Sequence, residues 1–380
     1  MNMIIGIDAS RNRSGGAIAH IVGIINEINP RDHGIDEIHI WSYKQLLDLL
    51  PNHSWLIKHN PNELEDSLFK QILWQYSSLP KELKSTNCSI LFTTDASTFC
   101  RFRPMIVLSQ DMLSYEPGVM NYFGYTKARL RLLAIKCVQN RAMKFADGVI
   151  FLTQYAANVI QKSCGQLPRI ALVPHGVGEE FKQQCKNNHW PTSNSIPINC
   201  LYVSNAAMYK HQWVVVRAIS LLRLRGHNIK LTLVGGGVGR AQELLEKQIA
   251  MSDPEGMFVN QMDFVKQNEL PLIISNADLF IFASSCENMP VTLLEAMSVG
   301  LPIACSSRGP MPEVLSDGGI YFDPENDISI ADAVEQIIVN PRLRLRISQQ
   351  AKLLSEQYSW SRCSNETWDF IKNTYKNLQL

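Results

Sequence analysis

The sequence is long enough for two domains and carries almost no net charge. Its 380 residues exceed what one hydrophobic core usually serves, and 46% of them are hydrophobic, so both domains can have well-filled cores. A formal net charge of +1 gives no global field that would attract nucleic acid, which argues against a nucleic-acid-binding protein. Any attraction to a membrane or to an anion must therefore come from a local patch.

Short apolar runs alternate with helical patterns, which is typical of βαβ units and parallel sheets. The fold class is therefore α/β. In the first half we predict a strand over residues 3–7, a polar loop over 8–16 and a helix over 17–27. The further strands predicted there cover residues 90–93, 106–108, 148–152 and 170–173.

A polar, irregular segment at residues 185–197 is predicted to be a linker. It separates a first domain at 1–184 from a second domain at 198–356, and a final helix follows at 357–380, where apolar side chains need a surface to cover. In the second domain we predict strands at 200–203, 230–234, 279–283 and 302–304, helices at 213–225 and from Ile330, and a glycine turn at 235–237.

Cysteine usage and hydropathy predict a cytoplasmic protein. The nine cysteines form no C-x-x-C pair, and no histidine stands at zinc-finger spacing, so reduced thiols in a cytosol are the simplest interpretation. The apolar run at residues 1–7 is too short for a signal peptide and lacks its charged lead. No stretch approaches the roughly 18 apolar residues of a spanning helix.

Two glycine-rich segments follow predicted strands. Gly15 and Gly16 would let the backbone approach a ligand closely, although a plain strand-to-helix connection is the alternative. Gly236 lies in the run 235–239, which is compatible with a nucleotide at the carboxyl ends of parallel strands. Arg240 stands where the third glycine of a dinucleotide-binding fingerprint belongs, which argues against an NAD-dependent dehydrogenase.

Lys210 lies directly after one predicted strand and before a helix. When a nucleoside diphosphate leaves a sugar, negative charge develops on the leaving oxygens, and a fixed ammonium there stabilises it. A solvated loop lysine is the alternative. His175 is interpreted as a turn residue rather than a ligand. Because the chain has no D-x-D pair, we expect no metal ion and no other cofactor at the donor site.

The most specific pattern is formed by Glu287 and Glu295, which have seven residues between them and straddle the start of a predicted helix. Pro290 suits the first helical position, and Gly300 with Pro302 predicts the end of the helix. Glu287 would then lie in the loop and Glu295 inside the helix, so that the two carboxylates face sugar hydroxyls.

The alternative is that Glu287 only caps this helix and that Glu295 is solvated on its outer face. In the first interpretation, the backbone around the helix start binds an anion such as a diphosphate through its free N–H groups and the helix dipole. The residues of this segment are Asn288, Met289, Pro290 and Val291.

Residues 122–144 combine aromatic and aliphatic side chains with basic ones, among them Lys127, Arg129 and Arg131. A basic amphipathic helix of this kind can lie on an anionic membrane face. The alternative is an ordinary surface helix that packs one apolar stripe. The first interpretation places the protein peripherally at the inner face of the plasma membrane.

Taken in order, these segments resemble glycosyltransferase family 4, which comprises retaining enzymes with two facing Rossmann-like domains, the GT-B fold. The resemblance spans most of the chain. Its specific part is the block from Glu287 to Glu295, which looks like the family's E-x(7)-E motif, together with the G-x-P strand at 300–304. The weaker parts are Gly15-Gly16, the run 174–177, Lys210 and the run 233–237.

The resemblance implies roles for individual residues. Glu287 would contact the donor sugar near its reacting face, Glu295 would hold ribose hydroxyls, and Lys210 with Gly16 would hold the diphosphate. The last helix would cross back to the first domain. The implied activity is metal-independent, retaining transfer of a hexose-type sugar from a UDP- or GDP-linked donor to a glycan or polyprenyl-linked glycan, as in lipopolysaccharide O-antigen or capsule assembly.

Two positions depart from the family pattern. Asn205 stands where the family usually has an arginine, five positions before Lys210. Many members also carry a histidine–aspartate pair in the first domain, and the matching stretch here keeps Asp111, a catalytic candidate, but has Gln110 in place of the imidazole. A non-catalytic sugar-nucleotide-binding subunit, a GT-B sugar-nucleotide epimerase and a glycan phosphorylase are the alternatives.

Overall fold

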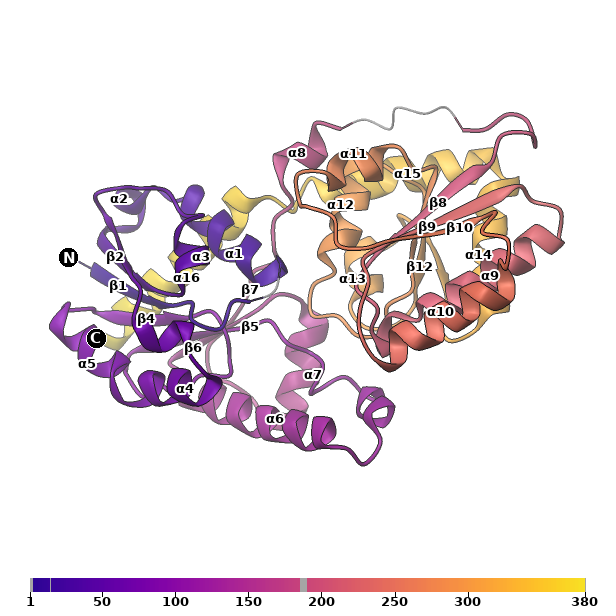
Figure 1. Ribbon diagram of the computed structural model, residues 1–380. Helices are drawn as coiled ribbons and strands as arrows, with labels where there is room; N and C mark the ends of the chain where they lie inside the picture. The colour runs from indigo at the N-terminus through magenta and orange to yellow at the C-terminus, as the bar shows by residue number, and fades with distance from the viewer. Residues whose placement is uncertain (1–2, 14, 185–189, 380) are drawn as a thin grey trace. The chain divides into compact units, whose positions relative to one another are not determined.

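A computed structural model describes residues 3–13, 15–184 and 190–379. These residues form two compact α/β units, each of which is described by itself (Figure 1). The first unit comprises Met1–Gly176 together with Ser359–Leu380, and the second comprises Val177–Tyr358. The units thus divide at 176 and 358, whereas the sequence suggested 184 and 356. Part of the predicted linker, residues 185–189, lies outside the described residues.

Among the described residues, the first unit contains a seven-stranded parallel sheet with the order β3-β2-β1-β4-β5-β6-β7. The five strands predicted for this unit are all present, with small differences in their ends. The prediction missed β2 because the exposed Asp36 and Glu37 interrupt its apolar residues. It missed β3 because this strand has only four residues, three of them partly exposed. The strands are β1 (Met3–Asp8), β2 (Ile35–Trp41), β3 (Leu56–His59), β4 (Ile90–Thr93), β5 (Met105–Ser109), β6 (Gly148–Phe151) and β7 (Ile170–Leu172).

The final helix, α16 (Trp360–Gln379), belongs to the first unit, as the sequence predicted. Its apolar face covers α1 (Gly15–Asn26): Trp368 is fully buried, and its indole Nε1 donates to the Ile24 carbonyl at 3.3 Å. The other helices here are α2 (Pro30–His33), α3 (Lys44–Leu47), η1 (Asn62–Glu65), α4 (Leu68–Ser77), α5 (Leu79–Ser85), η2 (Val119–Phe123), α6 (Lys127–Phe145) and α7 (Gln154–Cys164).

The start of α1 differs from the prediction. The helix begins at Gly15 rather than at Ala17, so Gly15 and Gly16 form its first turn and are not part of the preceding loop. A Cβ added at Gly15 would meet no atom within 4 Å, so close packing does not require glycine there. Their backbone N–H groups have no acceptor within the helix, since the first turn of any α-helix leaves its donors free.

The second unit contains, over its described residues, a six-stranded parallel sheet with the order β10-β9-β8-β11-β12-β13. The four predicted strands are present, and β10 and β13 were missed. Both lie at sheet edges and are partly exposed, so neither has a continuous apolar run that a sequence pattern would show. The strands are β8 (Ile198–Val203), β9 (Ile229–Val234), β10 (Val259–Met262), β11 (Leu279–Phe282), β12 (Ile303–Ser306) and β13 (Ile320–Phe322).

The two-glutamate helix is α12, which spans Val291–Val299. Pro290 is its N-cap and not its first helical residue, because a ψ of 83° places it outside the helical region. Gly300 ends the helix with a φ of 82°, as predicted. The other helices of this unit are α8 (Glu179–Lys182), η3 (Met208–Lys210), α9 (Gln212–Leu224), α10 (Arg240–Ser252), α11 (Leu270–Ser275), α13 (Met311–Leu315), α14 (Asp327–Val339) and α15 (Pro341–Ser355).

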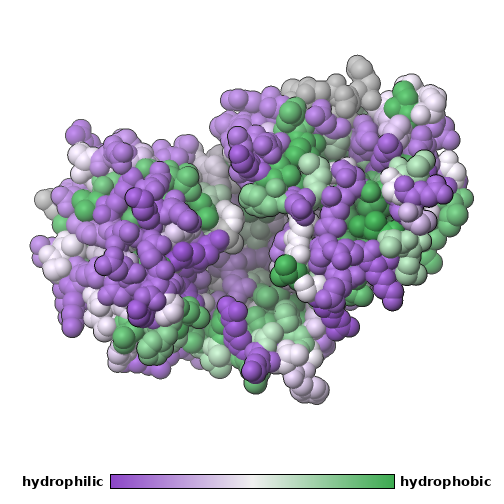
Figure 2. Space-filling view, viewed as in Figure 1, coloured by the Kyte–Doolittle hydropathy of each residue, from purple (hydrophilic) through white to green (hydrophobic). Residues whose placement is uncertain are grey.

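Each sheet has helices on both faces (Figure 1). In the second unit α9 packs on α10 and α14, whereas α12 packs on α11 and α15. The molecular face in Figure 2 is mainly hydrophilic, with separate hydrophobic patches. Among the described residues, no helix combines the length and the apolar character that crossing a bilayer requires.

Candidate functional site

The candidate site lies at the carboxyl edge of the second unit's sheet, where the strand order reverses. From β8 the chain continues to β9 on one side, and from β11 it continues to β12 on the other. Ligands of open α/β sheets bind outside the carboxyl ends of the strands at such a reversal. The loops that leave β8 and β11 carry Lys210 and Glu287, so the topology brings these two predicted site residues together.

Lys210 and Glu287 form an ion pair, with Lys210 Nζ contacting Glu287 Oε1. Their side chains are 11% and 15% exposed, so the alternative of a solvated loop lysine is wrong. Lys210 Nζ also lies 5.7 Å from the centre of the Phe282 ring, a distance at which a cation and an aromatic face attract. The ammonium group is therefore held at the strand ends by a carboxylate and an aromatic ring.

The backbone that carries Lys210 is tied to both strands of the reversal. The Tyr202 hydroxyl on β8 donates to the Lys210 carbonyl at 2.8 Å. The Ser285 N–H in the β11 loop donates to the Tyr209 carbonyl at 2.8 Å, and the Ser285 hydroxyl lies 2.9 Å from His211 Nε2. These bonds fix the position of Lys210 before any ligand binds.

The glycine run after β9 packs tightly against the loop after β8. Gly235 has a φ of +108°, and a Cβ there would lie 2.5 Å from the Ser204 carbonyl oxygen, so only glycine fits without a shift. At Gly236 a Cβ would lie 3.1 Å from Asp263 Oδ1. Asn205 is exposed in the loop that this run touches. Asn205 and Gly236 therefore lie at the same sheet edge as Lys210.

The N-terminus of α12 opens onto this edge. The Thr292 hydroxyl donates to the Val203 carbonyl at 3.3 Å, which fixes the helix start beside the end of β8. The N–H groups of Val291 and Thr292 have no acceptor inside the helix, and the positive end of the helix dipole favours an anion. Asn288, Met289 and Pro290 link this helix start to the ion-paired Glu287, and Asn288 and Met289 are buried.

Glu295 is buried inside α12, with 3% of its surface exposed. The alternative of a solvated outer-face glutamate is therefore wrong. Gln267 Nε2 donates to Glu295 Oε1 at 3.0 Å, and Oε2 has no hydrogen-bond partner among the described residues. Burial raises the pKa of Glu295 to about 8, the bond from Gln267 lowers it, and the charge of Glu180 raises it. A hydroxyl group that donated to Oε2 would satisfy this buried oxygen.

The first unit has a strand-order reversal of its own, between β1 and β4. Asp8 at the end of β1 accepts from the Ser10 hydroxyl at 2.6 Å and from Gln75 Nε2 at 2.7 Å. After β4, the Thr94 hydroxyl donates to Asn12 Oδ1 at 2.5 Å. Sequence reasoning missed this polar network, although a row of polar residues directly after each of two buried strands is a usable signal.

Asp111 belongs to this edge of the first unit, after β5. It accepts from the Leu113 N–H at 2.9 Å, and burial raises its pKa, the Leu113 bond lowers it and the charge of Asp95 raises it. Gln110, which stands in place of the expected imidazole, donates its amide to the Thr94 carbonyl at 2.9 Å. Gly15, Gly16 and Asp111 thus lie in the first unit, and the other predicted site residues lie in the second.

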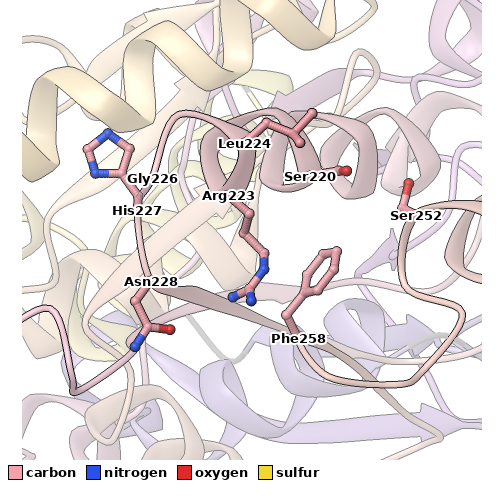
Figure 3. Close-up of a pocket in the computed structure, with 8 residues that line it drawn as sticks. All are labelled: Ser220, Arg223, Leu224, Gly226, His227, Asn228, Ser252 and Phe258. Atoms are coloured by element: carbon pink, nitrogen blue, oxygen red, sulfur yellow. The ribbon is translucent and has the colours of Figure 1, made fainter.

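A hollow of about 430 Å³ lies at the opposite, amino-terminal edge of the second sheet (Figure 3). Asn228 and Phe258 directly precede β9 and β10, and the Arg223 guanidinium lies 4.6 Å from the centre of the Phe258 ring. Arg223 Nη1 also donates to the Ile229 carbonyl at 2.9 Å. None of the predicted site residues lines this hollow. It lies at the sheet edge opposite to Lys210 and Glu287, so we do not assign it to the donor site.

The fold is the GT-B fold, as comparison with solved structures shows. Sucrose-phosphate synthase from Thermosynechococcus elongatus matches with a TM-score of 0.74 at 15% sequence identity, over 99% of both chains. HepE from Anabaena, solved in complex with UDP-glucose, matches with a TM-score of 0.69 at 17% identity, over 99% of both chains. The two parallel-sheet Rossmann-like units are therefore those of a GT-B protein.

The second unit is similar in sequence to glycosyltransferases. Residues 191–354 match the family model described as glycosyl transferases group 1. The O-antigen chain mannosyltransferase B of Escherichia coli is 26% identical over 178 residues, which cover 47% of this chain and 45% of that protein. The chain spans about half the length of the curated relatives it matches. The matched domain includes the whole Lys210–Glu287 edge.

The burial of Glu295 predicts a pH-dependent stability. Its folded pKa of about 8 lies above its ordinary value of 4.5, so its protonated form stabilises the fold below about pH 4.5, and this contribution is lost as the pH rises through 8. We expect the unfolding free energy of wild type, relative to Glu295→Gln, to fall by several kcal/mol over this range in urea titrations. Exposed Glu255→Gln should follow wild type at every pH, and parallel pH profiles for wild type and Glu295→Gln would contradict the assignment.

Proposed function

We propose that this protein is a retaining glycosyltransferase that moves a hexose-type sugar from a nucleoside diphosphate to an acceptor hydroxyl. The observation that carries the proposal is the Lys210–Glu287 ion pair at the strand-order reversal of a unit similar to glycosyl transferases group 1. A cation and a carboxylate held together there match two adjacent parts of a nucleotide sugar, because the diphosphate is anionic and the sugar next to it carries hydroxyl donors.

The donor is proposed to be a UDP- or GDP-linked sugar. The glycine run at 235–237 lets a nucleotide approach the backbone, and the N-terminus of α12 with Lys210 provides donors for the diphosphate. The unpartnered Oε2 of Glu295 is suited to accept from a ribose hydroxyl. HepE, which shares the fold, was solved with UDP-glucose, and this supports a nucleotide-sugar donor here.

In the proposed reaction the bond between the anomeric carbon and the diphosphate oxygen breaks, and a bond to the acceptor oxygen forms on the same face. The leaving phosphate takes the acceptor proton. Lys210 and the α12 N–H groups stabilise the charge that develops on the leaving group. Glu287 positions the sugar and offsets oxocarbenium charge without forming a covalent intermediate. Asp111 is proposed as a further catalytic residue, and no metal ion is required.

The acceptor is proposed to be a glycan or a polyprenyl-linked glycan, as in O-antigen or capsule assembly. The relative from Escherichia coli is an O-antigen chain mannosyltransferase, and this supports the class of acceptor. The segment around α6 carries exposed Tyr125, Leu130 and Leu133 beside Lys127 and Arg131, whereas the buried residues of α6 lie on another face. This exposed face is suited to peripheral contact with anionic lipids.

A non-catalytic sugar-nucleotide-binding subunit is the second candidate. One observation favours it: the amide of Gln110, where an imidazole was expected, is engaged with the Thr94 carbonyl within its own unit. Asn205 likewise supplies no positive charge beside Lys210. Sugar transfer to an acceptor distinguishes the two proposals, and a sugar-nucleotide epimerase would instead convert the donor without an acceptor.

The donor-site assignment predicts that a nucleotide stabilises the protein against heat. We expect one of UDP, GDP, ADP, CMP and dTDP to raise the thermal midpoint, with about 2.7 kcal/mol of stabilisation at 100 times its dissociation constant. Glu295→Ala should lose this gain, and Glu255→Ala, an exposed glutamate of the same unit, should keep it. If no nucleotide shifts the midpoint of wild type, the donor-site assignment is wrong.

Glu287→Gln tests the catalytic assignment separately from binding. The amide keeps the size of the side chain but removes the negative charge that offsets the oxocarbenium ion. We expect turnover to fall by about 10²- to 10³-fold, whereas the midpoint shift with the preferred nucleotide stays close to that of wild type. Near-normal turnover in a sugar-transfer assay would remove Glu287 from the catalytic residues.

Charge reversal on α6 tests the membrane contact. Changing Lys127, Arg129 and Arg131 to glutamate should weaken partitioning onto anionic vesicles by about 100-fold, because each basic residue contributes about 1 kcal/mol near such a surface. The matched control reverses three exposed basic residues of the second unit, which are Lys230, Lys247 and Arg342. Equal partitioning of both variants and wild type would refute a contact through α6.

A further inference from the structure

Three ligand-type side chains meet in the interior of the first unit. His20 comes from α1, His175 follows β7, and Cys363 comes from α16. They are 1%, 3% and 1% exposed. His20 Nδ1 lies 3.1 Å from His175 Nδ1 and 3.9 Å from Cys363 Sγ, and the three ligand atoms all lie within 4.8 Å of one another.

Hydrogen bonds alone do not satisfy this cluster. A neutral imidazole nitrogen has either one proton or one in-plane lone pair, so His20 Nδ1 serves one partner well and not both His175 and Cys363. The other ring nitrogen, His20 Nε2, is buried and has no partner among the described residues.

The distances fit a single metal ion. With metal–nitrogen bonds of about 2.05 Å, the separation of the two Nδ1 atoms corresponds to an angle of about 98° at the metal. With a metal–sulfur bond of about 2.3 Å, the separation of His20 Nδ1 and Cys363 Sγ corresponds to an angle of about 127°. One angle is smaller and the other larger than the tetrahedral value, so these two separations are compatible with one tetrahedral ion.

The Trp360 ring and a close backbone contact shield the cluster from solvent. Trp360 covers the cluster, with ring centroids 6.3 Å from His20 and 5.8 Å from His175. A Cβ at Gly176 would lie 2.3 Å from the Trp360 backbone N, so glycine permits this close cover. Trp360 is itself half-buried, which leaves the cluster one side chain below the surface.

We propose that His20, His175 and Cys363 form a zinc-binding site. Imidazole nitrogen and thiolate sulfur are both ligand atoms that Zn²⁺ binds. On binding, the Cys363 thiol loses its proton to solvent and the sulfur–zinc bond forms. The ion would fasten α16 to α1 and to the chain that leaves β7. The site is independent of the donor site and does not depend on the proposed function.

Cobalt substitution tests the proposal in the full-length protein. We expect one equivalent of Co²⁺, added after removal of bound metal with a chelator, to produce a thiolate-to-cobalt charge-transfer band that Zn²⁺ then abolishes. Cys363→Ser should lose the band, with an apparent affinity more than about 100-fold weaker. Cys137→Ser removes an exposed thiol of the same unit and should keep it.

Thermal unfolding with and without Zn²⁺ provides a second test, which can also be applied to variants whose folded state is less stable. Zn²⁺ should raise the midpoint of wild type and of Cys137→Ser, and it should leave the midpoints of Cys363→Ser and His175→Asn unchanged. The proposal is overturned if wild type gives no cobalt band, or if Cys363→Ser and His175→Asn retain both the band and the shift. The three side chains would then be held by hydrogen bonds and packing alone.

Discussion

The ion pair between Lys210 and Glu287 is the interaction on which the candidate site depends. Taking two opposite charges out of water carries a desolvation penalty that their attraction offsets only in part, so such a pair is weak evidence for stability. It occurs here at the strand-order reversal, where loops from β8 and β11 meet. Because the Tyr202 and Ser285 hydrogen bonds hold the lysine backbone in place, an arriving diphosphate would meet a cation already positioned at the sheet edge, which it would share with Glu287.

The two glutamates of the same motif have different environments, and this difference separates their proposed roles. Glu287 is paired with an ammonium group at the sheet edge, whereas Glu295 is enclosed in α12 with a raised pKa. A carboxyl group with a raised pKa and an unpartnered oxygen gains from any hydroxyl that donates to it. Nucleotide binding and ionisation of Glu295 would therefore be coupled, whereas the Glu287 carboxylate would have to share Lys210 with the diphosphate.

The last helix of the chain packs in the first unit, although the second unit separates the two segments in the sequence. α16 returns from the second unit and packs its buried Trp368 on α1. The same return brings Cys363 to His20, which precedes it by 343 residues, and His20 to His175, 155 residues apart. A metal ion at this junction would link three segments that are distant in sequence, and closing such long loops restricts the unfolded chain strongly.

The sequence by itself determined the α/β class and nine of the thirteen strands found among the described residues. It also determined that α12 ends at Gly300, that Glu287 lies in the loop before this helix, and that Glu295 lies inside it. These follow from local periodicity and from backbone preferences of glycine and proline. Only the tertiary structure decided that Lys210 pairs with Glu287 across 77 residues, that Glu295 is buried, and that His175 meets His20 and Cys363. The reason is physical: spacing along a chain fixes which residues share an element, whereas burial and pairing between elements depend on the order of strands in the sheet and on the helices that cover it.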